Sequence, residues 1–502
     1  MRGPARRAAA GRVVPAGADS AQPSRPLIAT APAISLLLGP ARRLRLALRP
    51  PTAWRWRRNR PLELVGFLLV AIGLSLGIAT WRHFFDLSVY HGAIRYWADG
   101  GSIYDYVAPL STYGFTYTPF AAIGMLPMAI LPWPLAIATT CVAIGAATVV
   151  VIRWFVYPIA RRRGWVPWYA VGIVTACVIA FDPLRETFLF GQVNMYLVAL
   201  VGFDLLFLTR RGSRFAGVGI GLATALKLTP GVFLIYLLVT GRWRAALTAS
   251  SAAAAATLIG AALAPDASRV FWTDALWNTD RVGQLDYISN QSLNGAVARL
   301  NPLDPSTVLW AVAVVAVLVV WAFRVRRAVA VGDEKTGFAL TGVVTCLISP
   351  ITWVHHLVWV LPALLVLLDR ALPALDRQPG ATLPTGTRRR RWLWGLLVGA
   401  YLILGSRVIW AFDDTWTNPL VWFVSNAYVW VSLALLIGLP IAKAPVAAAP
   451  QQPVQTPTAA APVIVPDAPP VPDPDEVVAA GVRYPEDAMA GAGSPGSVGP
   501  AR

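Results

Sequence analysis

The chain has 502 residues, of which 56% are hydrophobic and only 14% are charged. Soluble domains carry about a quarter charged residues, so this composition excludes an ordinary soluble protein and predicts that most of the chain lies in a lipid bilayer. The net charge is +18, and the three cysteines form no CxxC motif, which indicates neither a disulfide framework nor a zinc site.

Residues 1–60 are predicted to be a basic, disordered N-terminal arm. They carry thirteen arginines against one acid, Asp19, and are rich in alanine and proline. Anionic lipid headgroups are the expected partner of this charge. Because the arm has no nucleic-acid-binding fold signature, we expect no nucleic-acid partner. Its apolar run, residues 27–39, is too short to span a bilayer, and we expect no cleavage there.

Residues 61–443 contain twelve apolar runs that can form helices, with arginine clusters between them. Cytoplasmic loops concentrate arginine and lysine, so we place all six clusters inside, which requires an even number of crossings between neighbouring clusters. The runs are 62–80, 134–152, 166–181, 193–208, 215–226, 229–240, 245–264, 306–323, 337–350, 354–368, 392–409 and 426–442. The prediction is an all-α, multi-pass plasma-membrane protein with both termini in the cytoplasm, ending in a Pro- and Ala-rich disordered tail at 444–502.

The even-number condition decides two ambiguous stretches. Residues 115–131 would place an arginine cluster outside if they crossed the membrane, so we predict an amphipathic or half-inserted helix on the outer face, broken by prolines. Residues 215–240 lie between two inside clusters and must go out and return, with Lys227 at the turn. All four histidines and several acids then fall in outer segments, so the polar chemistry lies on one face.

Asp86 follows the first span at the start of a short amphipathic helix that ends at Gly100 and Gly101. A carboxylate at the membrane surface can act as general base toward a sugar hydroxyl. Because Asp86 precedes an apolar periodic run, a helix N-cap is an equally good interpretation from spacing alone.

Two further outer segments carry candidate binding residues. Tyr117 is suited to stacking on a sugar or packing an isoprenoid chain, although aromatics also gather at membrane interfaces for no other reason. The segment FDPLRETFLFGQVNMY, which we expect to be a short loop, supplies Arg185, Gln192 and Asn194. Arg185 can bind a phosphate through two N–H groups, or it can form an ordinary salt bridge with its acidic neighbours.

Lys227 stands alone as a cation inside apolar sequence. A lipid phosphate is one candidate partner, and snorkelling of its ammonium to the surface is the alternative. Asn290 and Gln291 offer neutral donors and acceptors suited to sugar hydroxyls, in a composition that is also typical of loops. His355 and His356 open a span, and adjacent helical residues point about 100° apart, so one can address a phosphate while the other packs. No third ligand is spaced to join them in a metal site.

Six motifs in one order resemble glycosyltransferase family 87, actinobacterial multi-pass enzymes of the GT-C architecture. The resemblance runs from about residue 81 to 368, and Thr352 stands where the pattern expects serine. The motifs are DLSVYHGAIRYWADGGSIYDY, FTYTPFAAIGMLP, FGQVNMYLVAL, GVGIGLATALKLTPGVFLIY, SNQSLNG and SPITWVHHLVW. The resemblance implies a fold with a catalytic aspartate in the first outer loop, followed by two juxtamembrane helices.

The same resemblance implies α-(1→2)-mannosyl transfer from polyprenyl phosphate mannose to a glycolipid or polysaccharide acceptor. Asp86 would then be the catalytic base. Lys227, Arg185 and one of His355 or His356 would bind the donor phosphate, whose charge grows in the transition state. The sugar and acceptor candidates are Tyr117, Gln192, Asn194, Asn290 and Gln291. Neither a cofactor nor a metal is expected.

Three alternatives remain open at this stage. Some members of the family transfer arabinofuranose from decaprenyl phosphate, and the sequence does not separate the two donors. A lipid-linked sugar flippase would place ionisable groups at mid-membrane rather than on one side. A non-catalytic scaffold would tolerate replacement of Asp86.

Overall fold

A computed structural model describes residues 60–79, 84–109, 111–278, 283–373, 386–412 and 418–442, although side chains at 60, 71–79, 386 and 387 lie outside the description. Within these ranges the backbone is helical and forms no β-strand, and Val107 and Gly114 make an isolated antiparallel bridge. The predicted basic arm at 1–60, apart from its last residue, and the predicted tail at 444–502 lie outside the described residues.

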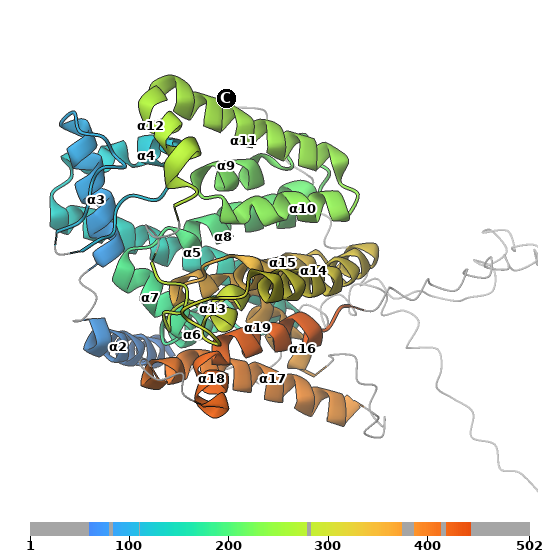
Figure 1. Ribbon diagram of the computed structural model, residues 1–502. Helices are drawn as coiled ribbons and strands as arrows, with labels where there is room; N and C mark the ends of the chain where they lie inside the picture. The colour runs from blue at the N-terminus through green and yellow to red at the C-terminus, as the bar shows by residue number, and fades with distance from the viewer. Residues whose placement is uncertain are drawn as a thin grey trace, which may run out of the picture. The chain divides into compact units, whose positions relative to one another are not determined.

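The chain forms α-helices joined by short 3-10 and π segments (Figure 1). Those of the first half are α2 Arg60–Ala79, α3 Phe85–Ala98, α4 Pro119–Met125, η1 Leu126–Ile130, α5 Trp133–Arg162, α6 Pro167–Ile179, α7 Asp182–Phe190, α8 Asn194–Phe203, η2 Asp204–Thr209, α9 Val218–Leu226, η3 Thr229–Gly231 and α10 Val232–Val239. Those of the second half are α11 Trp243–Leu263, α12 Pro265–Val270, η4 Phe271–Ala275, α13 Leu293–Ala298, α14 Thr307–Ala330, α15 Glu334–Ile348, η6 Val354–Val360, α16 Leu361–Ala371, α17 Gly386–Ser406, η7 Val408–Phe412, α18 Pro419–Ser425 and α19 Ala427–Gly438.

A helix occupies each of the twelve apolar runs, so the all-helical prediction is confirmed. Among the described residues, four helices are long and apolar enough to cross a membrane, and six spans result if each of two bent helix pairs counts as one. The four are α5, α11, α14 and the continuous stretch from η6 to α16. The structure therefore supports a membrane helical protein, whereas twelve crossings exceed what helix length and composition support.

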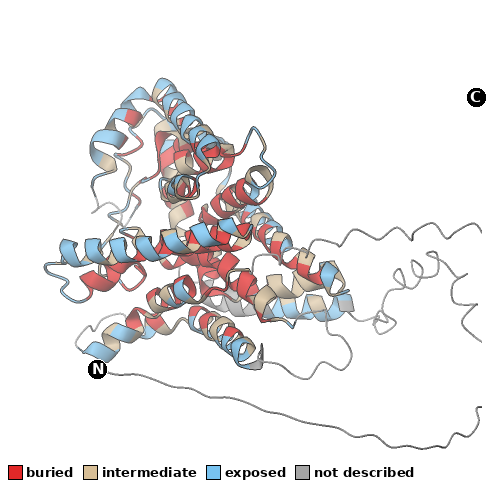
Figure 2. Ribbon diagram, turned by 90° about the vertical axis from the view of Figure 1, so that its right-hand side faces the viewer, coloured by how far each residue is buried: buried red, intermediate tan, exposed pale blue. Residues whose placement is uncertain are grey.

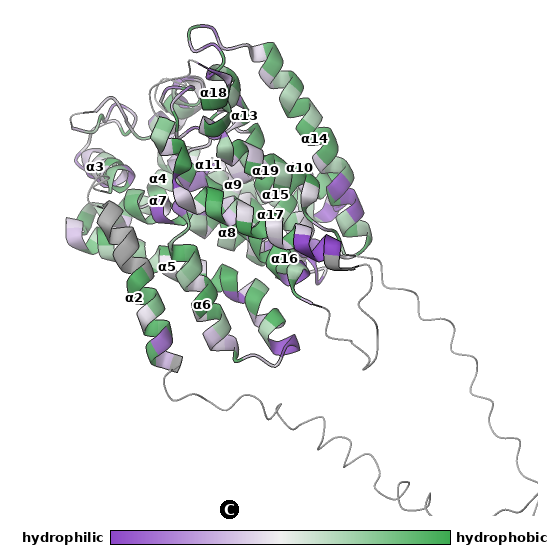
Figure 3. Ribbon diagram, turned by 90° about the horizontal axis from the view of Figure 1, so that it is seen from below, coloured by the Kyte–Doolittle hydropathy of each residue, from purple (hydrophilic) through white to green (hydrophobic). Residues whose placement is uncertain are grey.

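Several helices turn apolar side chains outward, as expected of surfaces that face lipid. Figure 2 shows exposed helix faces beside buried ones, and Figure 3 shows that hydrophobic residues predominate along most helices. On α14, Val308 is 74% exposed and Phe323 69% exposed. Arg324, Arg326 and Arg327 follow at the end of that helix, where a charged cluster is expected to leave the bilayer.

Two groups of buried side chains hold the helices together. The larger one joins α5 to α11 with α13 to α17 and α19, and α9, α10 and α11 pack side by side (Figure 1). The smaller one joins α3 and α4 with the intervening segment and Phe271. In it, Tyr90 packs edge-on against Phe115 and Tyr117, with ring centroids 6.3 and 5.1 Å apart. This second core fixes α3, and with it Asp86.

Local sequence explains where these elements begin and end. Residues 115–131 form α4 and η1, two short helices broken at proline as predicted, and the Thr118 side chain caps α4 by accepting a hydrogen bond from the Ala121 N–H. The prediction of a short loop is wrong for residues 182–190, which form helix α7. Pro183 sits in its first turn, where proline costs no hydrogen bond, and Gly191 ends it at φ +70°.

Lys227 interrupts the helical stretch between α9 and α10, as predicted for the turn at this position. The N-terminal end of α9 is held by Asp204, whose buried carboxylate accepts hydrogen bonds from the N–H groups of Gly217, Gly219 and Ile220. An acidic group is favourable at a helix N-terminus because the unpaired N–H groups there carry partial positive charge. Asp204 thereby fixes the helix that ends at Lys227.

Candidate active site

A cavity of about 920 Å³ lies between α3, the 113–118 segment, the end of α7, the α9–α10 break and the 349–356 segment. Its walls differ in chemistry. Asp86, Tyr90, Tyr117, Gln192, Lys227 and His356 supply charged and polar groups, whereas Leu228, Val232, Phe271 and Leu276 supply apolar surface. A concave site with few polar groups among apolar walls is typical of a small-molecule or lipid binding site.

Asp86 lies in the first turn of α3 and reaches this cavity. The N-cap position belongs to Phe84, so Asp86 does not hold the place that the capping interpretation assigned to it. Its Oδ2 accepts a hydrogen bond from Gln192 Nε2. Leu87 and Val89 are buried beside it, so α3 turns its apolar face to the protein and Asp86 toward the cavity.

Gln192 is placed against Asp86 by the glycine that precedes it. A Cβ atom on Gly191 would lie 2.6 Å from the Leu87 Cβ, and the left-handed backbone there also disfavours a side chain. Only glycine therefore allows the end of α7 to approach α3 this closely. Gln192 Nε2 also donates to Tyr90 Oη at 2.9 Å, and Gln192 Oε1 accepts from Tyr117 Oη at 3.1 Å.

Tyr90 was not among the predicted site residues, although a sequence signal existed. It follows Asp86 by four residues, which places both on one face of a helix. Burial raises the pKa values of Tyr90 and Tyr117, so both phenols stay protonated and can donate hydrogen bonds at neutral pH. Tyr90 Oη donates to Tyr117 Oη at 3.1 Å.

Lys227 lies at the other side of this polar cluster. Its Nζ donates to Asn194 Oδ1 at 3.1 Å and to Tyr117 Oη at 3.4 Å, and it lies 5.2 Å from the centroid of the Tyr117 ring. Burial lowers the pKa of Lys227 to about 8, and the nearby Asp86 charge opposes that shift. Hydrogen bonds through Gln192 and Tyr117 therefore connect the carboxylate of Asp86 to the ammonium of Lys227.

The two adjacent histidines have different surroundings, as predicted from the different directions in which neighbouring helical side chains point. His356 Nε2 lies 3.1 Å from Lys227 Nζ, and His356 Nδ1 accepts a hydrogen bond from the Trp353 backbone N–H. His355 is buried, with its ring 5.3 Å from Phe190 and 4.6 Å from the His356 ring. Both rings border the cavity, and His356 is the one that contacts the lysine.

Four predicted site residues lie outside the lining of the cavity, and one of them, Asn194, contacts Lys227. Arg185 donates to Asp182 at 2.8 Å in a buried ion pair, which is the salt bridge that its acidic neighbours suggested. Asn290 accepts from the Thr352 N–H and donates to the Leu285 carbonyl. Gln291 donates to the carbonyls of Ile288 and Ser425. The amides of Asn290 and Gln291 thus bind backbone groups, and the guanidinium of Arg185 binds a carboxylate.

The arrangement suits the transfer of a group from an anionic leaving group to a hydroxyl. A carboxylate that accepts an oriented hydrogen bond can take a proton from that hydroxyl. An ammonium and an imidazole across the same cavity can bind an anion whose charge grows as a bond breaks. In the described part of the chain, no three His, Cys, Asp or Glu side chains cluster as metal ligands would.

Comparison with known proteins gives consistent results. Residues 115–350 match the sequence model of glycosyltransferase family 87. A polyprenol-phosphate-mannose-dependent alpha-(1-2)-phosphatidylinositol mannoside mannosyltransferase of Mycolicibacterium smegmatis is 36% identical over 396 residues, covering 71% of this chain and 88% of that protein. The protein of the same description from Mycobacterium tuberculosis is 34% identical, covering 60% of this chain and 75% of that protein.

A third relative has a pentamannoside in its description. The polyprenol-phosphate-mannose-dependent alpha-(1-2)-phosphatidylinositol pentamannoside mannosyltransferase of Mycolicibacterium smegmatis is 31% identical over 403 residues, covering 77% of this chain and 90% of that protein. No solved structure matches the chain significantly.

Proposed function

The chain belongs to glycosyltransferase family 87 and is a hexosyltransferase, and on that premise we propose that it moves mannose from polyprenyl phosphate mannose to a mannose-bearing glycolipid. The new bond is an α-(1→2) linkage, formed with inversion. The observation that carries this proposal is the cavity that Asp86 and Lys227 share. All three relatives described above have mannose donors in their descriptions, which favours mannose over arabinofuranose.

Asp86 is the catalytic base of the proposed reaction. Its carboxylate takes the proton from the acceptor 2-hydroxyl as that oxygen attacks the anomeric carbon of the β-linked mannosyl donor. The bond between the anomeric carbon and the phosphate oxygen breaks, and polyprenyl phosphate leaves with its electron pair. Gln192 supports this role because its amide donates to Asp86 Oδ2 and so fixes the direction of the carboxylate.

Lys227 and His356 bind the donor phosphate. Because the His356 Nδ1 accepts the Trp353 N–H, the neutral ring carries its proton on Nε2, the atom that faces Lys227. Two donors thus point at the same region, and a phosphate oxygen placed there accepts from both. Such charge-assisted bonds strengthen as the leaving phosphate gains charge in the transition state. Arg185, which pairs with Asp182, has no part in this proposal.

The donor lipid follows the apolar side of the cavity. Leu228 and Val232 lie just beyond Lys227 in sequence, and Phe271 and Leu276 line the same cavity. An isoprenoid chain gains free energy from contact with such side chains. Leu228 is 39% exposed, so this side of the cavity approaches the outer surface of the helical bundle, where a lipid can enter.

The membrane arrangement that fits this chemistry has the cavity on the outer face and both termini in the cytoplasm. We propose that short apolar helices, such as α9 and α10, cross the membrane together with the long ones, giving the twelve crossings that the apolar runs predict. Under this arrangement the tail and the basic arm are cytoplasmic, and the arm contacts anionic headgroups. Accessibility labelling of single cysteines at residues 99 and 214, from each side of the membrane, tests it.

The decisive experiment replaces the proposed base. Full-length protein in lipid nanodiscs receives radiolabelled polyprenyl phosphate mannose and a mannosylated glycolipid, and Asp86→Asn is expected to form no elongated product. Asp99→Asn is the matched control, because Asp99 is exposed just past the end of the same helix and does not line the cavity. Equal turnover by Asp86→Asn refutes the mechanism, and transfer from the arabinose donor alone refutes the donor assignment.

A further inference from the structure

The cavity has a third wall that the donor and the base do not use, and it is aromatic. Trp353 packs edge-on against Tyr287 with ring centroids 6.0 Å apart, and Tyr287 packs edge-on against Trp410 at 6.4 Å. All three side chains line the cavity and none of them is buried. We call these three rings the aromatic wall.

The aromatic wall continues toward the catalytic carboxylate. Gly283 has a φ of +120°, and a Cβ atom there would lie 3.1 Å from the Trp353 ring and 3.3 Å from the Tyr113 hydroxyl. Tyr113 in turn packs edge-on against Phe85 at 5.8 Å. Phe85 immediately precedes Asp86, so two groups of rings, which meet on either side of Gly283, lie between the proposed base and Trp410.

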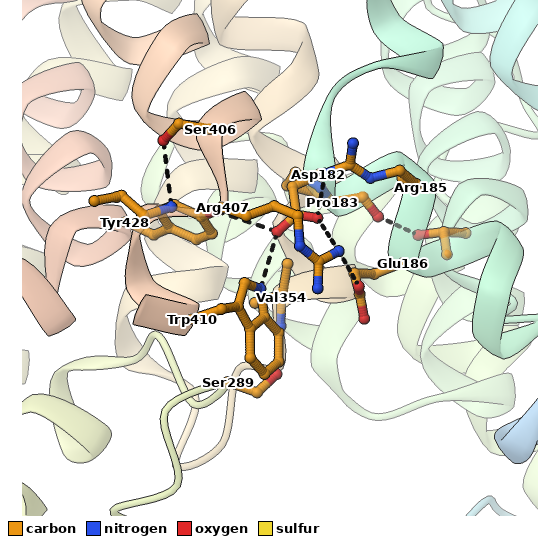
Figure 4. Close-up of polar contacts among 12 residues, drawn as sticks. Asp182, Pro183, Arg185, Glu186, Ser289, Val354, Ser406, Arg407, Trp410 and Tyr428 are labelled. Carbon is orange, nitrogen blue, oxygen red and sulfur yellow. Dashed lines mark hydrogen bonds and ion pairs between the residues drawn. The ribbon is translucent and has the colours of Figure 1, made fainter. Parts of the chain in front are cut away.

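Trp410 is held in place by charged residues behind it. Its indole N–H donates to Asp182 Oδ2 at 3.3 Å, and its ring lies 5.3 Å from the guanidinium carbon of Arg407 (Figure 4). Arg407 also binds Asp182 at 3.0 Å and Glu186 at 2.8 Å. One edge and one face of the indole are therefore fixed before any ligand arrives, which lowers the entropy cost of binding.

The composition of the aromatic wall distinguishes it from the lipid side of the cavity. The lipid side is aliphatic near Lys227, whereas the aromatic wall consists of tryptophan and tyrosine with Ser289 and Ser349 nearby in the lining. These residues combine an apolar ring with a polar edge. A pyranose has the matching character, because its C–H faces are attracted to the negative ring face and its hydroxyls need hydrogen-bond partners.

We propose that the aromatic wall binds the sugar residues of the acceptor that precede the residue being extended. The ligand is a pyranose oligosaccharide, and Arg407 with Asp182 are positioning residues for Trp410. Because the three rings follow one another along the cavity wall, with centroids 6.0 and 6.4 Å apart, the wall accommodates more than a single sugar. This inference rests on the proposed function and adds that the enzyme prefers acceptors with several mannose residues over acceptors with one.

The test compares alkyl mannosides that carry one, two or three mannose residues on the same alkyl chain. For the unmodified protein, the acceptor KM is expected to fall as residues are added. In Trp410→Ala the KM for the trimannoside is expected to rise about fivefold, while the donor KM stays the same, because one aromatic contact contributes about 1 kcal/mol. Trp410→Phe keeps a ring and recovers part of the affinity. Trp243→Ala is the control, since Trp243 is exposed and outside the cavity lining.

Equilibrium binding of the trimannoside separates this inference from the proposed function. Asp86→Asn is expected to bind it, and adding Trp410→Ala is expected to weaken that binding by a similar factor. The unmodified protein could bind the trimannoside in a way that depends on Trp410 and yet transfer no mannose. That result would contradict the proposed function but would still support the aromatic wall as a sugar site. Unchanged acceptor KM with a raised donor KM in Trp410→Ala overturns the inference and assigns the wall to the lipid.

Discussion

Lys227 Nζ lies 3.1 Å from His356 Nε2 although the neutral histidine ring presents a proton rather than a lone pair to it. The Trp353 backbone N–H, which donates to His356 Nδ1, fixes that tautomer. Two hydrogen-bond donors this close favour an acceptor that lies beside both of them, and an ammonium favours an anionic one. The pair therefore defines where the phosphate of the donor is expected to bind.

Removing the charge of Lys227 is expected to weaken donor binding much more than acceptor binding. In Lys227→Gln the donor KM should rise between about tenfold and a hundredfold, because a hydrogen bond to a charged group contributes about 1.5–3 kcal/mol. The acceptor KM should change little. Steady-state kinetics with each substrate varied in turn measure both values. Arg95→Gln removes an exposed cation from α3, outside the cavity lining, and should leave both KM values unchanged, whereas equal effects of the two substitutions would argue against a specific phosphate contact.

The lowered pKa of Lys227 predicts a loss of donor affinity in mildly alkaline solution. Burial lowers this pKa to about 8, so the ammonium is charged below that pH and loses its proton as the pH rises through it. The kcat/KM for the donor should therefore be constant below about pH 8 and fall above it. Bound phosphate stabilises the ammonium, so kcat should decline at a higher pH than kcat/KM. Arginine stays protonated throughout, and Lys227→Arg should abolish the decline near pH 8 even if its affinity differs.

Gln192 is expected to act through Asp86 rather than on the donor. In Gln192→Leu the carboxylate loses the amide that orients it, and kcat should fall about a hundredfold, with the donor KM nearly unchanged. If both residues serve one step, Asp86→Asn with Gln192→Leu should be no slower than Asp86→Asn alone. Single-turnover rates measure this coupling. Independent, multiplicative losses would show that Gln192 acts elsewhere.

The helical framework could be predicted from the sequence because its signals are local. Each of the twelve apolar runs holds a helix, and the prolines of the predicted break mark the start of α4 at Pro119 and the first turn of η1 at Pro127. The number of membrane crossings is less accessible, because α9 and α10 are too short to decide it by length. Helix α7 contradicts the prediction of a short loop, and its polar residues do not face solvent. They are instead paired in the interior.

The site, like the fold, could be predicted from the sequence only in part. The motifs that carry Asp86, Tyr117, Gln192, Asn194, Lys227 and His356 are far apart in sequence, and the structure brings these residues together. Asn290 and Gln291 have the same chemical types, yet their amides bind backbone groups at Thr352 and Ser425. Nothing local distinguishes an amide that faces a ligand from one that faces a carbonyl. Trp410 could not be found either, since its neighbours Tyr287 and Asp182 come from distant segments.

Arg407 combines a strained backbone with a charge that two buried carboxylates require, and two substitutions separate these effects. Its φ is +59°, a conformation that costs a residue other than glycine about 1 kcal/mol or more. Arg407→Ala and Arg407→Gly both remove the ion pairs with Asp182 and Glu186, which should destabilise the fold by about 3 kcal/mol because the carboxylates stay buried. Glycine, however, adopts the left-handed conformation freely. Arg407→Gly should therefore unfold at a higher temperature than Arg407→Ala, as intrinsic fluorescence during heating in detergent can measure. A lower midpoint for the glycine variant would mean that the backbone at this joint between α17 and η7 carries no strain.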